Sequence, residues 1–260
     1  MYLLRYEFNP LRLIRYFPAL ILLLFAGTTT PLNAQVIRKS SVEFYSSDSL
    51  LISADHYYSN KDNPYILLFH QEGSSRGEFD QIARRFVKMK FNCLAVDLRN
   101  GGKFEYVENL TSQRAKEKLL PAGIETGKDI LAAIDFAQSV NEKNVILLGS
   151  SWSASMCLKV ASEDERVSAV MAFSPGEFLR PMNDLADLFS KLQKPVFVAG
   201  SPMEYPYLVK STRSIPEGFL SLVNPPERSV ERGIPMLFDT NPGHNEYWFS
   251  VLIFIKSLKT

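Results

Sequence analysis

Residues 145–156 read VILLGSSWSASM, which is an apolar run, a glycine, and then small residues around a tryptophan. An apolar run without alternation is typical of a strand that is buried on both faces of a sheet. The residues that follow lead into a helix-like stretch, Trp152–Glu163. The segment therefore predicts a buried strand that turns sharply into a helix at Ser151.

Similar strand-like and helix-like stretches alternate over the rest of the chain, after a β-rich segment, Val42–Tyr58, that predicts an antiparallel hairpin. Apolar strands alternating with amphipathic helices predict an α/β fold with a mostly parallel, doubly wound sheet. Residues 103–123 form either an irregular stretch or a small lid, and the proline-rich residues 202–226 have no clear pattern. The expected strands are Tyr65–Gln71, Phe91–Leu98, Asn144–Gly149, Val167–Phe173, Pro195–Ala199 and Ile234–Phe238, and the further helices are Gly77–Lys90, Ile130–Ala137, Asp184–Leu192 and Asn245–Leu258.

The composition predicts one domain with an ordinary hydrophobic core. The 260 residues are 46% hydrophobic, and their formal net charge is +1. No basic run is longer than a pair such as Arg84–Arg85, so nucleic acid is not expected as a partner. Cys93 and Cys157 lie in apolar segments, which favours two buried thiols over a disulfide. No Cys and His spacing typical of a metal site occurs.

The first 34 residues have the pattern of an export signal. Three arginines precede the apolar run Phe17–Ala26, and Leu32-Asn33-Ala34 resembles a cleavage site. We expect cleavage there, a mature domain over residues 35–260, and a periplasmic or extracellular protein without stable membrane insertion. The alternative is an uncleaved anchor in which Leu11–Ile14 extend the apolar run.

Ser151 is the candidate nucleophile. Ligands meet a doubly wound sheet at the carboxyl ends of its strands, where a serine on a tight strand-to-helix turn is well placed to attack a carbonyl. Gly149 to Ser153 match the pattern G-x-S-x-G, except that Ser153 stands in for the second glycine. Both flanking residues must be small because the strained turn brings them together. The backbone N–H of Trp152, at the start of the helix, is a candidate oxyanion donor.

Chain order selects the partners of Ser151. On such turns the serine is followed first by an acid and then by a histidine, and only His244 of the three histidines comes after Ser151. The acid is expected beyond the strand Pro195–Ala199, where Glu204 is the only carboxylate in residues 200–205. Its role would be to hold the imidazole in the tautomer that accepts the serine proton. Glu177, after the preceding strand, is the alternative acid.

The second oxyanion donor is expected in the loop after His70, where Gln71 offers a backbone N–H. His70 itself is expected to anchor this loop, and His56 to be an ordinary strand residue. Arg76 and Arg99 either line the pocket or form salt bridges. A site of this kind needs no metal or organic cofactor.

Four stretches resemble the α/β-hydrolase superfamily, and within it secreted bacterial proteins of the dienelactone-hydrolase-like group. They are residues 70–79 (HQEGSSRGEF), 92–102 (NCLAVDLRNGG), 149–155 (GSSWSAS) and 172–178 (AFSPGEF). The resemblance covers most of the chain from about Val42. It implies an α/β-hydrolase fold with little or no cap and a Ser-acid-His hydrolase of ester or related acyl bonds. Dienelactone hydrolases carry cysteine where this chain has Ser151, so cleavage of dienelactones is not implied.

The leading hypothesis is an exported serine hydrolase that cleaves small-molecule carboxylic esters through an acyl-enzyme on Ser151. In this scheme His244 moves the proton, Glu204 orients His244, and the N–H groups of Gln71 and Trp152 hold the oxyanion. Two alternatives stay open. One is a non-catalytic binding protein on the same fold, and the other is an acyltransferase with the same triad.

Overall fold

The computed structural model describes residues 36–216 and 218–258, which belong to one compact unit. The predicted signal segment and its cleavage site lie outside the described residues, so export and the boundary at residue 34 stay predictions. Within the described ranges, no helix combines the length and the apolar character that crossing a membrane requires.

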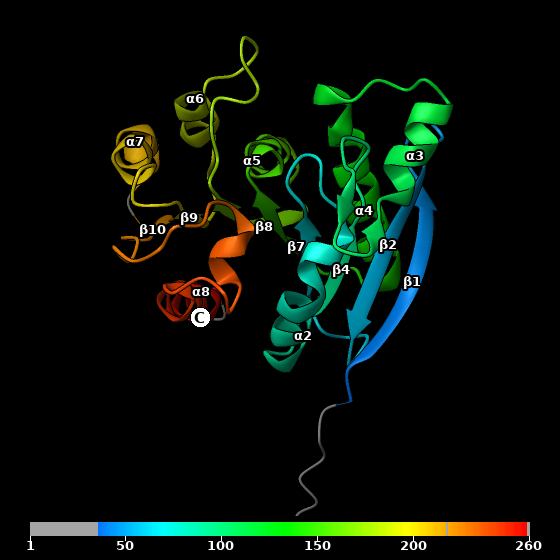
Figure 1. Cartoon of the computed structure of the whole chain (residues 1–260), viewed down its shortest axis with the longest axis horizontal. Helices are drawn as coiled ribbons and strands as arrows, with labels where there is room; N and C mark the ends of the chain where they lie inside the picture. Colours follow the sequence, from blue (N-terminus) through cyan, green and yellow to red (C-terminus); the bar gives the residue numbers. More distant parts are fainter. Residues whose placement is uncertain (1–35, 217, 259–260) are drawn as a thin grey trace, which may run out of the picture. The chain divides into compact units, whose positions relative to one another are not determined.

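An eight-stranded sheet forms the centre of the fold, in the order β1-β2-β4-β3-β7-β8-β9-β10 (Figure 1). The first two strands form an antiparallel hairpin, and β2 is also antiparallel to β4. All later neighbours are parallel, which confirms the predicted sheet. The strands are β1 (Arg38–Tyr45), β2 (Leu51–Tyr58), β3 (Tyr65–Phe69), β4 (Asn92–Val96), β7 (Val145–Ser150), β8 (Val167–Phe173), β9 (Val196–Ala199) and β10 (Leu220–Leu222).

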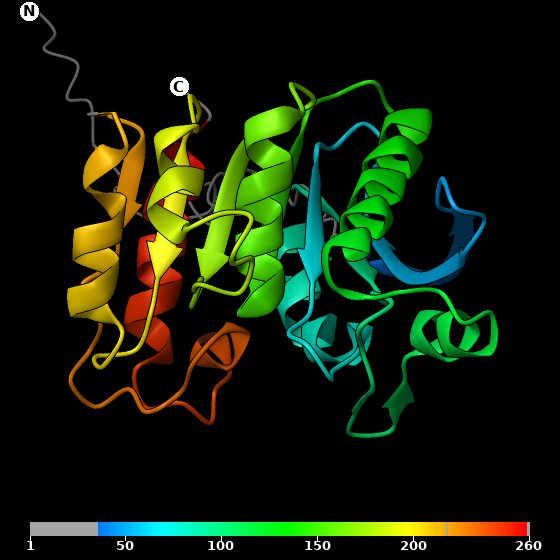
Figure 2. The same cartoon turned by 90° about the horizontal axis from the view of Figure 1, so that it is seen from above.

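Helices cover both faces of the sheet, as Figures 1 and 2 show. Every residue of β3, β4 and β7 is buried, so these strands need apolar cover on either side. One face packs on α2 (Asp80–Lys88) and α8 (His244–Ser257). The other face packs on α4 (Gly127–Val140), α5 (Trp152–Glu163), α6 (Leu185–Ser190) and α7 (Tyr205–Ser211).

The stretch 103–123 folds into small regular elements. A two-stranded hairpin, β5 (Lys103–Phe104) and β6 (Val107–Glu108), is followed by α3 (Leu110–Glu117). Short 3₁₀ helices complete the described chain: η2 (Arg76–Phe79), η3 (Gly123–Thr126), η4 (Thr212–Ser214) and η5 (Ile234–Leu237).

The predicted last strand, Ile234–Phe238, is wrong. Residues 234–237 form η5, and the last strand is β10, which lies inside the proline-rich segment. Pro235 lacks the N–H that a sheet ladder needs, and its fixed φ suits the first turn of a helix. The run is apolar because Ile234, Met236 and Leu237 are buried, and a run this short does not distinguish strand from helix.

Three residues with predicted structural roles have those roles in the fold. Cys93 and Cys157 are buried free thiols. His56 lies on β2, where its Nε2 is 2.8 Å from the hydroxyl of Tyr65, and burial lowers its pKa to about 4. The half-buried imidazole of His56 is therefore neutral at ordinary pH.

Candidate active site

Ser151 connects β7 to α5, and its backbone is strained. Its φ is 55° and its ψ is −116°, a combination that residues other than glycine rarely adopt. Its N–H donates to the carbonyl of Phe173 at 2.8 Å, which fixes the turn against β8. Trp152 is the first residue of α5, so its N–H has no partner within the helix. The turn thus brings a serine and a helix N-terminus together at the carboxyl edge of the sheet.

Gly149 and Ser153 make this sharp turn possible. A Cβ on Gly149 would lie 2.6 Å from the Cα of Ala154 and from the carbonyl oxygen of Ser153, so no larger residue fits. Ser153 does more than leave space. Its hydroxyl donates to the carbonyl of Phe69 at 2.7 Å and accepts the N–H of Ser150 at 2.9 Å. The side chain that replaces the second glycine of the pattern therefore joins β3 to β7.

Gln71 lies beside this turn because of the register between the two strands. Phe69 of β3 is paired with Gly149 of β7, and Gln71 and Ser151 each follow two residues later. The carboxyl ends of neighbouring parallel strands meet at one edge, so the predicted oxyanion donor is next to the serine turn. The N–H of Gln71 donates to Oε2 of Glu78 at 3.4 Å.

Glu204 follows β9, where the acid was expected, and three groups surround its carboxylate. Oε2 accepts the hydroxyl of Ser174 at 2.7 Å and the N–H of Ser201 at 2.9 Å, and Oε1 accepts Nε of Arg232 at 2.6 Å. Burial alone would raise the pKa of Glu204, but these hydrogen bonds and the guanidinium outweigh burial and lower it. Glu204 is therefore ionised, and its partner is an arginine.

Residues 232–234 are held over the ends of β7 and β8. The N–H of Gly233 donates to the hydroxyl of Ser174 at 2.8 Å, and the N–H of Ile234 donates to the hydroxyl of Ser150 at 2.9 Å. A Cβ on Gly233, whose φ is 65°, would lie 2.6 Å from Oγ of Ser150. In Figure 2 the segment that carries η5 runs along the edge where the arrows of β8 and β9 end. Sequence reasoning missed Arg232, although Gly233 before Pro235 signals a tight turn.

The hydrogen bond of His244 goes to a residue other than its predicted partners, Ser151 and Glu204. This histidine is the first residue of α8, and its Nδ1 is 2.9 Å from the carbonyl oxygen of Asn241. It lines a cavity of about 120 Å³ together with Arg85 and Trp248. Among the described residues, no hydrogen bond joins His244 to Ser151 or to Glu204. The register thus places Gln71 beside Ser151 and Trp152. Hydrogen bonds do not join the members of the predicted triad within the described residues, and the triad stays a prediction.

A profile of the dienelactone hydrolase family matches residues 52–204, which is more than half of the chain. The chain belongs to the dienelactone hydrolase family. This membership supports a hydrolase that acts on ester bonds, and it agrees with the position of Ser151 at the carboxyl edge of the sheet. A search among curated proteins finds no match.

Solved structures of other proteins show the same fold as this dienelactone hydrolase family member. An esterase of Pyrococcus furiosus is similar at 16% identity and a TM-score of 0.63, over 89% of this chain and 96% of that chain. A dienelactone hydrolase of Anabaena variabilis is similar at 16% identity and a TM-score of 0.62, over 84% and 95% of the two chains. A dienelactone hydrolase-like promiscuous phosphotriesterase from metagenomic libraries is similar at 15% identity and a TM-score of 0.58, over 86% and 98%. These likenesses confirm the predicted α/β-hydrolase fold.

The alternative acid of this family member, Glu177, is engaged in local contacts. Its Oε2 accepts the N–H of Leu185, the first residue of α6, at 3.0 Å, and lies 3.0 Å from Nε of Arg180. The hydroxyl of Tyr207 donates to its other oxygen. These contacts tie the loop after β8 to α6 and α7, and none of them reaches the serine turn.

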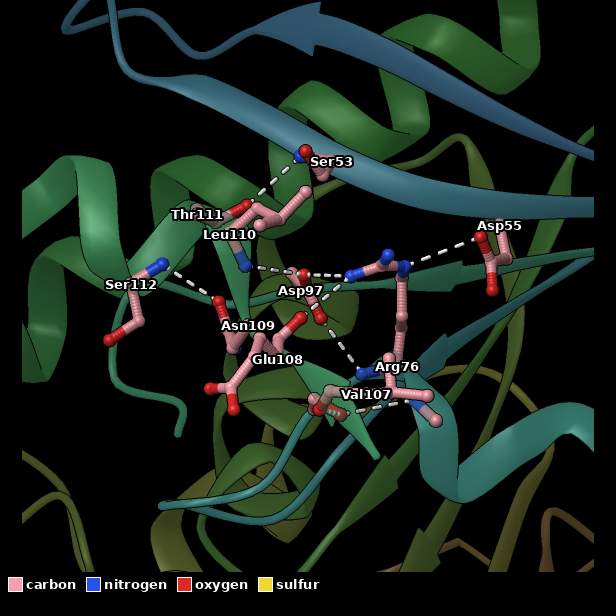
Figure 3. A network of polar contacts seen from close by, with 12 residues as sticks. Ser53, Asp55, Arg76, Asp97, Val107, Glu108, Asn109, Leu110, Thr111 and Ser112 are labelled. Carbon is pink, nitrogen blue, oxygen red and sulfur yellow. Dashed lines mark hydrogen bonds and ion pairs between the residues drawn. The ribbon is translucent and has the colours of Figure 1, made fainter. Parts of the chain in front are cut away.

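Arg76 and Arg99 form salt bridges, which was one of the two predicted outcomes. The Nη1 of Arg76 is 2.5 Å from Asp97, and its Nε is 3.3 Å from Asp55 (Figure 3). Nη1 also donates to the carbonyl of Glu108 at 3.0 Å, so the network ties the β5-β6 hairpin to the sheet. The fully buried side chain of Arg99 bridges Asp129 and Asp48, each at 2.7 Å.

His70 anchors the loop that carries Gln71, as predicted. Its Nε2 accepts the N–H of Leu98 at 2.9 Å, so its Nδ1 is the protonated nitrogen and donates to the carbonyl of Gln71 at 2.7 Å. Burial lowers the pKa of His70 to about 4, which keeps this tautomer neutral. Across the part of the chain that the structure describes, no group of three or more His, Cys, Asp or Glu could hold a metal ion.

Proposed function

We propose that the protein is an exported hydrolase that cleaves carboxylic esters of small molecules through an acyl-enzyme on Ser151. The hydroxyl oxygen of Ser151 attacks the ester carbonyl, the alcohol leaves, and water then releases the acid. The N–H groups of Gln71 and Trp152 are the proposed oxyanion donors, and one such donor contributes about 3–4 kcal/mol to barrier lowering in comparable sites. The observation that carries this proposal is the strained backbone of Ser151 at the turn between β7 and α5.

His244 is the proposed general base and Glu204 the residue that orients it. In the described structure the carboxylate of Glu204 accepts a hydrogen bond from Arg232, and the imidazole of His244 is hydrogen-bonded to the carbonyl of Asn241. Catalysis by this triad therefore requires His244 to gain hydrogen bonds to Ser151 and to Glu204 that the described structure does not contain. Hydrogen bonds between catalytic groups commonly tighten only when substrate is bound.

A second candidate function is a non-catalytic binding protein, and the Arg232–Glu204 contact favours it. A guanidinium stays protonated in proteins, so Arg232 cannot accept the proton of Ser151. An arginine in permanent contact with the acid would leave His244 without the group that orients it. The two candidates differ in whether the Ser151 hydroxyl reacts.

Reaction with a fluorophosphonate separates the two functions. We expect a covalent adduct on Ser151 in the wild-type protein and none in Ser151→Ala, whereas Ser162→Ala, a matched change on α5, should be labelled like wild type. A folded wild-type protein without adduct would favour the binding protein. Mass spectrometry of the exported chain tests secretion in parallel, because cleavage after Ala34 predicts a mature N-terminus at Gln35.

Turnover of p-nitrophenyl esters then tests the triad. Loss of the nucleophile in Ser151→Ala should lower kcat by roughly a millionfold, and loss of the acid in Glu204→Gln by roughly ten-thousandfold, as in other Ser-His-acid enzymes. His244→Asn should resemble Ser151→Ala. Glu177→Gln is the matched control and should keep wild-type activity. If Glu177→Gln alone of the two acid variants lost activity, Glu204 would not be the acid.

A further inference from the structure

Glu78 is a buried carboxyl group beside the proposed oxyanion donor. It lies on η2 with only 3% of its surface exposed, and its Oε1 is buried without a hydrogen-bond partner. Its Oε2 accepts the N–H of Gln71 at 3.4 Å. The N–H that is proposed to stabilise an oxyanion is therefore already directed at a carboxyl oxygen.

The position of Gln71 connects Glu78 to the reaction. The register of β3 on β7 brings Gln71 next to Ser151, and Oε1 of Gln71 is 3.6 Å from the Cβ position of Gly233 above the serine turn. Glu78 also lines a cavity of about 390 Å³ with Phe104 and Phe238. The carboxyl group of Glu78 thus borders this cavity and also contacts the backbone N–H of Gln71, next to Ser151.

We propose that Glu78 is a positioning residue that controls the oxyanion donor of the proposed hydrolase through the N–H of Gln71. When Glu78 is ionised, its carboxylate competes for this N–H and adds a negative charge beside the developing oxyanion. When Glu78 is neutral, it is a weaker acceptor, and the N–H is available to the substrate. The inference rests on the proposed function, because it assumes that an oxyanion forms at this turn.

The surroundings of Glu78 make its neutral form accessible. Burial raises the pKa of Glu78 to about 7, and no ion pair among the described residues includes it. The cations nearby have other partners, since Arg76 binds Asp97, Arg84 binds Asp80, and Lys103 binds Glu108. The titratable and charged groups on the elements and cavity walls around η2 are Tyr65, His70, Glu72, Arg76, Asp80, Arg84, Arg85, Lys88, Cys93, Asp97, Lys103, Glu105, Glu108 and Asp239.

The test is the pH profile of kcat/KM for a neutral aryl ester in wild type and Glu78→Gln. At each pH, kcat/KM of Glu78→Gln is divided by kcat/KM of wild type. This ratio cancels every other titration that the two proteins share. We expect Glu78→Gln to overtake wild type, with a ratio that rises about tenfold per pH unit above pH 7, because glutamine cannot ionise. Glu105→Gln, which removes an exposed carboxylate from the same cavity, should leave the wild-type profile unchanged.

A second measurement follows the contact itself. The amide nitrogen shift of Gln71 should titrate with a midpoint near pH 7 in wild type and lose this step in Glu78→Gln. Two outcomes would overturn the inference without contradicting the proposed hydrolase. One is a kcat/KM ratio of the two proteins that does not change with pH, and the other is a Gln71 amide shift in wild type that does not titrate near pH 7. Absence of turnover by folded wild-type protein at every pH, together with absence of a fluorophosphonate adduct, would overturn both.

Discussion

The carboxylate of Glu204 is held by the guanidinium of Arg232, whose Nε and Nη2 atoms both lie 2.6 Å from Oε1. Glu204 lies in the loop after β9, immediately before α7, at the carboxyl edge of the sheet, where an acid can orient a histidine. In this chain the carboxylate is oriented by Ser174, Ser201 and Arg232. The contact between Arg232 and Glu204 thus engages one oxygen of the acid that the proposed triad would use.

Replacing Arg232 tests whether this contact restrains the site. We expect Arg232→Gln to raise ester kcat/KM severalfold, because Glu204 becomes available to His244. The cost in stability should stay below about 1 kcal/mol, since the side chain of Arg232 is 65% exposed. Arg228→Gln is the matched control, because Arg228 is in the same loop and pairs with Glu246. A loss of turnover specific to Arg232→Gln would mean that the arginine assists the reaction.

Ser153 is expected to stabilise the fold through its hydroxyl. Ser153→Ala leaves the buried carbonyl of Phe69 and the buried N–H of Ser150 without this partner, which should lower the free energy of unfolding by about 2–4 kcal/mol. Ser162→Ala removes a hydroxyl nearer the surface of the same helix and should cost less than about 0.5 kcal/mol. Denaturant unfolding of both variants measures the difference. Equal stabilities would show that Ser153 acts only as a small spacer.

The alternation of apolar strands and amphipathic helices along the chain was sufficient to predict the fold, and the strand, small-residue turn and helix around Ser151 are encoded locally. Contacts between distant segments were not encoded in this way. Arg232 reaches Glu204 across 28 residues, and no local spacing reports an ion pair between two loops. Ser153 was interpreted as a substitute for glycine, but its hydroxyl reaches a carbonyl that lies 84 residues away.

The segment before α8 shows a second limit of sequence reasoning. The apolar residues of 234–238 predicted a strand, although burial against Ser150 and the core explains the same residues in a 3₁₀ helix. The strand β10 was missed because three residues in a proline-rich segment give no periodicity. His244 directly precedes the predicted helix Asn245–Leu258, and in the structure it is the first residue of α8.

Gly149 should tolerate no side chain. In Gly149→Ala the new Cβ would meet backbone atoms at 2.6 Å, and these cannot move without shifting α5 from β7. We expect a loss of about 3 kcal/mol or more in the free energy of unfolding, the upper range for overpacking. Gly127→Ala is the control, because its Cβ would be 3.5 Å from the sulfur of Met156, and the change should stabilise by about 0.4–1 kcal/mol. A stable Gly149→Ala protein would contradict the tight turn.

Because of Glu78, the free energy of unfolding should decrease as the pH rises from mildly acidic to mildly alkaline. Burial raises its pKa from 4.5 to about 7 in the folded state, so the folded protein binds one more proton than the unfolded chain in this interval. The stabilising contribution is therefore complete below pH 4.5 and is lost as the pH rises through 7, with a total of at most about 3 kcal/mol.

The stability of Glu78→Gln relative to wild type should accordingly increase with pH over this interval and level off above it. Urea unfolding at pH 5, 6, 7 and 8 measures this difference directly. Glu105→Gln should show no such trend, since Glu105 is exposed. A constant difference between Glu78→Gln and wild type would mean that Glu78 is already ionised at pH 5. The N–H of Gln71 would then face a permanent negative charge, and the proposed oxyanion site would depend on Trp152 alone.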